Sequence, residues 1–290
     1  MNNTTRTMTK HITAALALTL LATVASTATC HAQYVTAQFC TKAAAKAAMN
    51  ENFYANYGME ILSNGTGRLH SPQQSALHFS TNDWKIAQNG ALDNIAGRNA
   101  TGLWLEPGAE GTNKTLRAGV LVVNAREATS RGTLVSSEFV CRLASRLHGG
   151  NQGVFDTMYA AKGVRVFVNG LEDSPIKTNE LCIISFVLPA EVGIATGLAV
   201  SSAPGGADSR VMLMADPVPL WNRALDGQLL AAVLLSGDEP GESVLRGIEH
   251  GLALWHGVKG MQSATKVERD AAWATGFHGF GVWGTRFLLF

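Results

Sequence analysis

The residues of this 290-residue chain whose side chains could do chemistry are mainly histidines and cysteines. The histidines beyond residue 32 are His70, His78, His148, His250, His256 and His278. Glu249, His250 and His256 lie close in sequence, but a helix directs residues six apart to different faces. We therefore expect His250 and His256 not to bind one metal ion. Cys141 and His148 are seven apart, so on a helix they would face the same way as a thiolate–imidazole pair, unless Cys141 forms a disulfide.

No familiar catalytic motif joins these residues. The sequence lacks the GxSxG, HExxH, P-loop and GxGxxG patterns, and the glycines of residues 276–281 have GxxGxG spacing instead. We predict no metal and no cofactor. Catalytic groups also converge in space without any fixed spacing, so a periplasmic hydrolase with a site built from Asp216, His250 and His278 is one alternative.

Residues 1–32 have the three-part layout of a secretory signal peptide. Two basic residues precede the apolar segment Ile12–Val24, and small or polar residues follow it as far as Ala32. We predict cleavage between Ala32 and Gln33, with cleavage after Ala28 as the second choice. An uncleaved anchor is disfavoured, because the 13 residues of that segment would span about 20 Å as a helix, less than the hydrocarbon core of roughly 30 Å.

Three cysteines follow the predicted cleavage site: Cys40, Cys141 and Cys182. An exported protein meets an oxidising compartment, where one disulfide and one remaining thiol are expected. Three pairings are possible, and we favour Cys141–Cys182 because both residues lie in well-formed predicted elements of one segment. Cys40 would then be free, buried or bonded to another chain. A metal site is disfavoured because no CxxC spacing occurs.

The composition argues against several classes of protein. Hydrophobic residues make up 46% of the chain and charged residues 16%, which is too apolar for a disordered protein and too charged for a polytopic membrane protein. A formal net charge of +1 gives no basic excess for binding nucleic acid. Beyond the signal, no stretch approaches 18 uninterrupted apolar residues, so we predict no transmembrane span in the mature chain.

The clearest structural unit lies within residues 133–188. Apolar residues at helical spacing predict a helix that begins at Glu138 and ends at Gly149-Gly150. Alternating residues predict a strand over residues 164–168, which an Asn-Gly turn follows. Residues 181–188 are continuously apolar, and this predicts a strand that is covered on both faces.

The order of these elements resembles the C-terminal region of the type IVb pilins. The resemblance covers residues 133–188 and rests on a cysteine-bearing helix (FVCRLASRL), a Phe-Asp step (VFDTMY), a strand ending in Val-Asn-Gly (VRVFVNG) and a second cysteine before an apolar strand (ELCIISFVL). It implies an exported, non-catalytic assembly or accessory component of a pilus-like system.

Three further segments have helical patterns, at residues 38–54, 220–235 and 242–258. The second becomes wholly apolar at residues 229–235, so a buried strand is the alternative there. In the third, Gly247 and Gly251 form a GxxxG step, which we interpret as close packing against another element.

These patterns predict an α+β fold, with helices packed on a mostly antiparallel sheet and a helix-rich C-terminal segment. A stretch rich in Gly, Ser and Pro at residues 200–209 is the best candidate for a linker. We therefore expect a signal peptide over residues 1–32, an α+β domain over residues 33–198, and a helix-rich domain or extension over residues 210–290.

The predicted function is that of an exported, non-enzymatic structural or accessory protein of a pilus-like appendage or secretion system. We expect it in the periplasm or at the cell surface, with protein partners in the cell envelope and no nucleic-acid partner. Besides the hydrolase, the alternative is a glycan- or peptide-binding module that uses the glycine- and aromatic-rich residues 275–290.

Asn64, Asn99 and Asn113 each begin an Asn-x-Thr triplet in a turn-rich segment. A eukaryotic secretory pathway would glycosylate such sites. Chance occurrence of these triplets in polar turns is the interpretation that we prefer.

Overall fold

The computed structural model describes residues 35–49, 56–108, 115–126, 132–137, 141–148, 151–158, 163–189, 194–195, 211–215 and 224–277. For residues 137, 141–148, 151–158 and 194–195 it describes the backbone only. The predicted signal peptide, its cleavage site at Ala32–Gln33 and the C-terminal residues 278–290 lie outside the described residues.

The described strands form two sheets, in which all the strand pairs are antiparallel. The central sheet runs, in spatial order, β13 (Leu171–Glu172), β12 (Arg165–Val168), β14 (Leu181–Val187), β8 (Thr115–Ala125), β17 (Gly227–Ser236), β6 (Leu92–Asn94) and β5 (Trp84–Ile86). In addition, β1 (Val35–Cys40) pairs with β17, and β15 (Ile194–Ala195) pairs with β8. The outer sheet runs β11 (Asn151–Met158), β10 (Cys141–His148), β9 (Gly132–Ser137), β16 (Met212–Leu213), β7 (Leu103–Glu106), β4 (Ala76–Ser80), β3 (Thr66–His70) and β2 (Gly58–Ile61).

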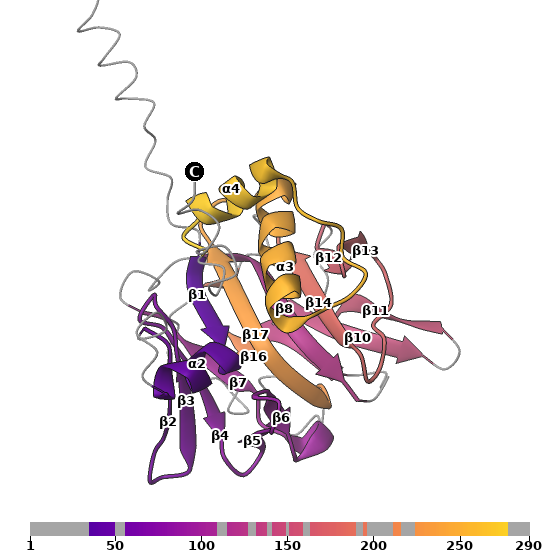
Figure 1. The fold of residues 1–290 in the computed structure, drawn as a ribbon. Coiled ribbons are helices and arrows are strands. Elements are labelled where there is room, and N and C mark those ends of the chain that lie inside the picture. Colours follow the sequence, from indigo (N-terminus) through magenta and orange to yellow (C-terminus); the bar gives the residue numbers. More distant parts are fainter. Residues whose placement is uncertain are drawn as a thin grey trace, which may run out of the picture. The chain divides into compact units, whose positions relative to one another are not determined.

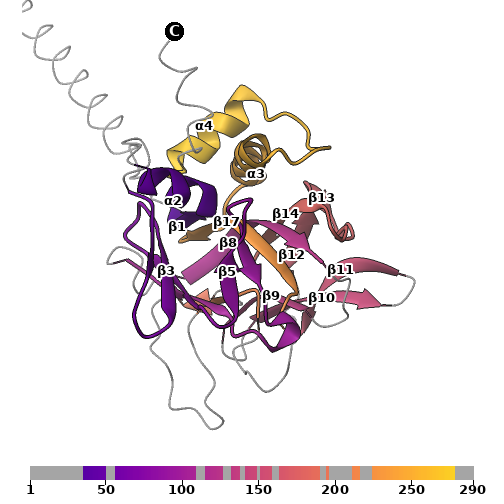
Figure 2. The same ribbon diagram turned by 60° about the horizontal axis from the view of Figure 1, so that its bottom comes forward.

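Among the described residues, three α-helices accompany the sheets, and they lie on one side of the central sheet (Figures 1 and 2). They are α2 (Thr41–Ala48), α3 (Glu242–His256) and α4 (Lys266–Ala274), and a 3-10 turn, η2, spans Gly97–Asn99. Within the described residues, none of these helices is long and apolar enough to cross a bilayer.

The central sheet is buried on both faces. Along β8, Val120 and Val122 belong to the apolar cluster that includes residues of α2, α3 and α4, whereas Leu121 and Val123 belong to the cluster shared with the outer sheet. This alternation is the period of two that a strand imposes on its side chains. The burial of both faces explains why the sequences of β8, β14 and β17 are mostly apolar, because neither face of these strands meets water.

The predicted α+β fold class is wrong, because the described residues are mostly β-structure with only three short helices. One cause is the helix predicted from Glu138, in whose place the chain forms β10. This strand pairs with β9 on one edge and with β11 on the other. Neighbouring strands thus supply its backbone hydrogen bonds, and this tertiary pairing overrides the helical spacing of its apolar residues.

The C-terminal segment is not helix-rich. Residues 220–235 were expected as a helix with a buried strand as the alternative, and the structure forms the strand, β17. It pairs with β8 on one side and with β1 and β6 on the other, so both ends of the described chain build one sheet. Residues 33–290 group as one compact unit, and residues 200–209, which were expected to form a linker, lie outside the described residues.

Several local predictions are confirmed. The strand at residues 164–168 is β12, and Asn169 and Gly170 turn the chain with φ angles of 52° and 78°. The apolar segment at residues 181–188 is β14, which is buried at six of its seven positions. The predicted helix at residues 242–258 is α3. Of the helix predicted at residues 38–54, residues 38–40 belong to β1 and residues 41–48 form α2, and residues 50–54 lie outside the described residues.

The GxxxG step of α3 provides a test of this packing. A Cβ atom on Gly247 would lie 2.1 Å from the backbone oxygen of Glu268 and 2.7 Å from Cβ of Ala272, both on α4. We expect Gly247→Ala to lower the free energy of unfolding by about 1–3 kcal/mol, despite the better helix propensity of alanine. At the control position Gly241, nothing lies within 4 Å of the added Cβ, so Gly241→Ala should cost less than about 1 kcal/mol. Denaturant unfolding measures both, and equal losses would contradict the close packing.

Candidate functional site

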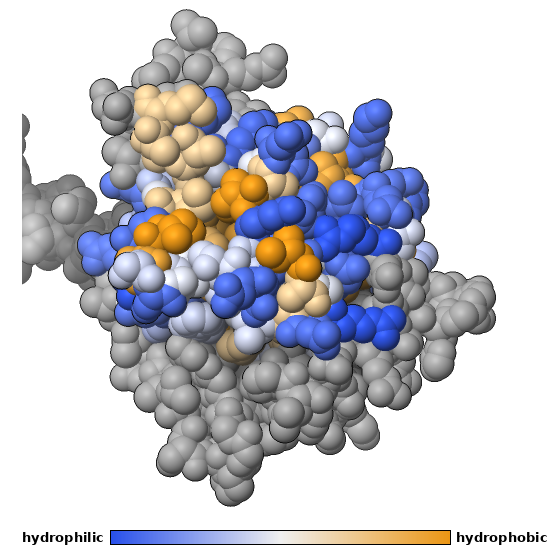
Figure 3. Space-filling view, turned by 90° about the horizontal axis from the view of Figure 1, so that it is seen from below, coloured by the Kyte–Doolittle hydropathy of each residue, from blue (hydrophilic) through white to orange (hydrophobic). Residues whose placement is uncertain are grey.

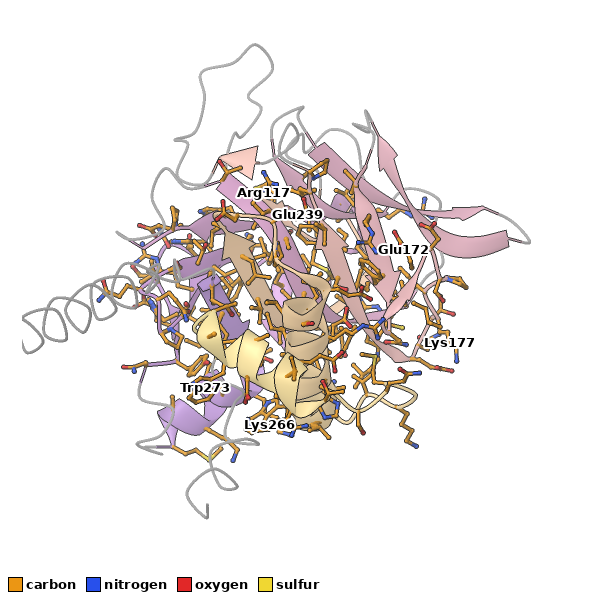
Figure 4. All side chains as sticks on the ribbon, turned by 90° about the horizontal axis from the view of Figure 1, so that it is seen from above. Arg117, Glu172, Lys177, Glu239, Lys266 and Trp273 are labelled. Carbon is orange, nitrogen blue, oxygen red and sulfur yellow. The ribbon has the colours of Figure 1, made fainter. Side chains whose placement is uncertain are left out.

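A cleft of about 400 Å³ opens between the turn that joins β12 to β13, helix α3, and the loop from α3 to α4. Its walls are residues 169–171 and 260–265, and α3 contributes Arg246 and Glu249. Figure 4 looks onto α3 and α4, with Glu172 of β13 and Lys266 of α4 labelled. The combination of a cavity, a buried carboxyl group and flanking charges makes this cleft the best candidate site.

Glu249 lies at the floor of this cleft and is only 3% exposed. It follows Ile248, which packs in the apolar cluster between α3 and the central sheet. Its Oε1 accepts a short hydrogen bond from Oγ of Ser185, a fully buried residue in the middle of β14. Its Oε2 accepts no hydrogen bond from the described residues, and a Cβ atom on Gly170 would lie 3.5 Å from it. One carboxylate oxygen is therefore held by the sheet, and the other is available on the side of the glycine turn.

Burial raises the pKa of Glu249, because removal from water disfavours the charged carboxylate. The hydrogen bond from Ser185 and the positive charge of Arg246 lower the pKa, but they do not offset the effect of burial. The carboxyl group thus takes up a proton at a higher pH than an exposed glutamate does.

The other charged groups around the cleft already form hydrogen bonds. The guanidinium of Arg246 donates to Oε1 of Glu242 over 3.1 and 2.8 Å. Oε2 of Glu268 accepts from the backbone N–H of Thr265 over 2.7 Å in a capping box, and these bonds lower the pKa of Glu268. Glu249 is the only buried residue among these three glutamates, and its Oε2 has no hydrogen bond to the described residues.

Ser185 does not have the arrangement of a nucleophile. It is fully buried, and its hydroxyl donates its proton to Glu249. An attacking serine must instead reach a substrate in the cleft. The pair therefore orients the carboxyl group of Glu249.

The favoured disulfide stays a prediction. Cys182 is a buried free thiol whose Sγ lies 3.8 Å from the backbone oxygen of Lys177. Cys141 lies on β10 rather than on a helix, and its side chain is outside the described residues. The helical face that was expected to join Cys141 to His148 therefore does not exist.

The structure instead brings Cys40 and His256 together, a pair that sequence spacing could not reveal across 216 residues. Cys40 Sγ lies 3.9 Å from His256 Nε2. Burial raises the pKa of the Cys40 thiol to about 11, and burial together with the charge of Lys42 lowers the pKa of His256 to about 3. Both groups are therefore neutral near pH 7, which is the opposite of a reactive thiolate–imidazolium pair.

The remaining predicted residues are dispersed. His250 is partly buried on α3, where burial and the charge of Arg269 lower its pKa. Asp216 and His278 lie outside the described residues, so the hydrolase site is not tested. Of the possible glycosylation sites, Asn64 and Asn99 are exposed in turns, and Asn113 lies outside the described residues.

A second polar cluster lies on the outer sheet, where His78 and Trp104 stack with ring centroids 5.1 Å apart. Arg68 Nε donates to His78 Nδ1 over 3.3 Å, and Glu106 lies 2.5 Å from His78 Nε2. The imidazole therefore carries its proton on Nε2 and donates it to Glu106. His78 is opposite both Arg68 and Trp104 in the strand register, an alignment that sequence alone did not provide.

The surface seen in Figure 3 shows small apolar patches separated by hydrophilic side chains.

No set of metal ligands is evident in the part of the chain that the structure describes, where three or more His, Cys, Asp or Glu side chains nowhere converge. Comparisons of the chain with models of protein families, with curated proteins and with solved structures found no match. The geometry of the cleft is therefore the support for the candidate site.

The raised pKa of Glu249 predicts how stability changes with pH. The folded state binds more protons than the unfolded state above pH 4.5, so Glu249 makes the wild type lose stability as pH rises from 4.5 to the folded-state pKa. We expect Glu249→Gln, which keeps an acceptor for Ser185, to gain stability relative to the wild type over this window. The gain should be at most about 1.4 kcal/mol per pH unit.

Denaturant unfolding between pH 4 and pH 8 measures this difference. Glu172→Gln is the control, because Arg165 lowers the pKa of Glu172. Its contribution to stability is then fully present above pH 4.5 and is lost only as pH falls below 4.5, so the difference between this variant and the wild type should be constant above pH 4.5. A Glu249→Gln difference that stays constant with pH would show that Glu249 titrates normally.

Proposed function

We propose that this protein is an exported, non-enzymatic accessory protein of the cell envelope that acts by binding a protein partner at the cleft above Glu249. The observation that carries the proposal is the buried carboxyl group, with one oxygen held by Ser185 and the other available in a cleft of about 400 Å³. Buried polar groups with unused hydrogen-bonding capacity are costly, and a ligand that satisfies them gains specificity.

The walls of the cleft are fixed before any partner arrives. Asn169 Oδ1 accepts from the backbone N–H of Ile183 over 2.8 Å, which ties the glycine turn to β14. The opposite wall leads into α4, whose first turn has the capping box of Thr265 and Glu268. A preformed site loses little conformational entropy on binding, and this supports recognition at this place.

The sequence supports export and the accessory role. Residues 1–32 have the pattern of a secretory signal, and the resemblance of residues 133–188 to pilins suggests an appendage or secretion system as the setting. The cysteine-bearing helix of that resemblance is strand β10 in the structure, so the proposal relies on the cleft and not on pilin architecture.

Export has a direct test. We expect the envelope fraction of cells that express the full chain to contain a protein whose N-terminus is Gln33, because a signal peptidase would cleave after Ala32. N-terminal sequencing measures this. Intact Met1 on protein in the cytosol would contradict export.

Binding at the cleft is tested by crosslinking in cells of the source organism. Leu171 lines the cleft and is 66% exposed, so a photoreactive benzoylphenylalanine at this position should form an adduct with the partner. The same substitution at Leu254, which is 52% exposed and does not line the cleft, should not form that adduct. Mass spectrometry identifies the products. Absence of an adduct from position 171, or the same adduct from both positions, would reject the cleft as the binding site.

A further inference from the structure

We infer that the cleft binds an alkylammonium group, whose charge contacts Oε2 of Glu249 beside the Gly170 turn. This inference rests on the proposed binding function and names the chemistry of the ligand. The ammonium could belong to a lysine side chain of the protein partner or to a free aliphatic amine, and the two sources share the same recognition.

The balance of charge favours a cation. Glu242, Glu249 and Glu268 surround the cleft and its adjoining hollow, whereas Arg246 is the only basic residue among the described residues that line them. Both side-chain hydrogen bonds of the Arg246 guanidinium go to Glu242, so it does not neutralise Glu249 by contact. An incoming cation would find the carboxylate of a buried residue that forms no ion pair with the described residues.

Apolar and acidic groups converge at the same point. A Cβ atom on Gly170 would lie 3.5 Å from Glu249 Oε2 and 3.7 Å from Cε of Met261. Glycine therefore leaves open a space that has a carboxylate on one side and a methyl group on the other. Leu171 and Ala264 extend the apolar lining. A methylene chain that ends in an ammonium matches this arrangement, because its stem contacts apolar side chains while its charge meets the acid.

The available oxygen also discriminates between cations. A guanidinium prefers to bond both oxygens of a carboxylate, but Ser185 already occupies Oε1. A divalent metal such as calcium requires six or more oxygen ligands. An ammonium is a compact charge with three donors, so one carboxylate oxygen and nearby backbone carbonyls suffice.

Binding should be linked to the release of a proton. Burial keeps the empty carboxyl group of Glu249 protonated at a higher pH than usual, and an ammonium favours the ionised form, so the displaced proton passes to the buffer. The charged groups near Glu249 are Arg246 and Glu242 on α3 and Glu268 on α4; β14 contributes only the Ser185 hydroxyl, and residues 169–171 carry no charge. Affinity should therefore rise with pH across the titration of Glu249.

The experiment titrates the full chain with matched probes by NMR and calorimetry between pH 5 and pH 8. The free-amine arm compares n-butylamine with n-butanol, and the peptide arm compares acetyl-Gly-Lys-Gly-amide with its norleucine counterpart. We expect the cationic probe of at least one arm to bind ten-fold or more tightly than its neutral match, and to shift the resonances of residues 169–171 and 260–265. Calorimetry in two buffers of different ionisation enthalpy should detect proton release below the pKa of Glu249.

Glu249→Gln should weaken binding of the cationic probe ten-fold or more, whereas Glu172→Gln on the neighbouring strand should bind as the wild type does. Binding of only one of the two cationic probes identifies the source of the ammonium. Equal binding of charged and neutral probes, no binding at all, or wild-type binding by Glu249→Gln would overturn the inference. The pH dependence and proton release of the wild type do not depend on how well any variant folds. If the ammonium probes fail while the Leu171 adduct persists, the ligand class is wrong and the binding function stands.

Discussion

The burial of both faces of the central sheet is the constraint on which the rest of this structure depends. Strands β8, β14 and β17 lie between a helical layer and a second sheet, so most of their side chains pack in one of two apolar clusters. Pairing with neighbouring strands satisfies their backbone groups without water. A polar side chain in this layer is consequently uncommon, and burying it without a hydrogen bond costs free energy.

Ser185 is such an exception, and the candidate site arises from it. Its hydroxyl, fully buried in β14, donates to a carboxyl group that α3 brings down onto the sheet. The sheet fixes one oxygen of Glu249, while the glycine turn after β12 leaves room beside the other. The same burial that requires this pairing also raises the pKa of Glu249, so the stability of the fold and the chemistry of the cleft have one physical cause.

Burial has the opposite chemical consequence at Cys40 and His256. Their proximity alone would be typical of an activated thiol, but loss of hydration favours the neutral form of each group, and Lys42 further disfavours a charged imidazole. The deciding difference is access. Glu249 has an oxygen beside a cleft, whereas the thiol of Cys40 is 2% exposed and held between β1 and α2.

Local signals in the sequence were enough to predict the Asn169-Gly170 turn, the strands β12 and β14, and helix α3 with its close-packed Gly247. Only the tertiary structure decided that β10 and β17 are strands. Pairing with β9 and β11 overrides the helical spacing of the apolar residues in β10, and the apolar run of β17 fits either element until neighbouring strands supply its hydrogen bonds. The tertiary structure also decided the site, since nothing local joins Ser185 to Glu249 across 64 residues. Glu249 is visible in the sequence beside the apolar stripe of α3. Its hydrogen bond to Ser185, its burial and the adjoining cleft arise only when the helix packs on the sheet.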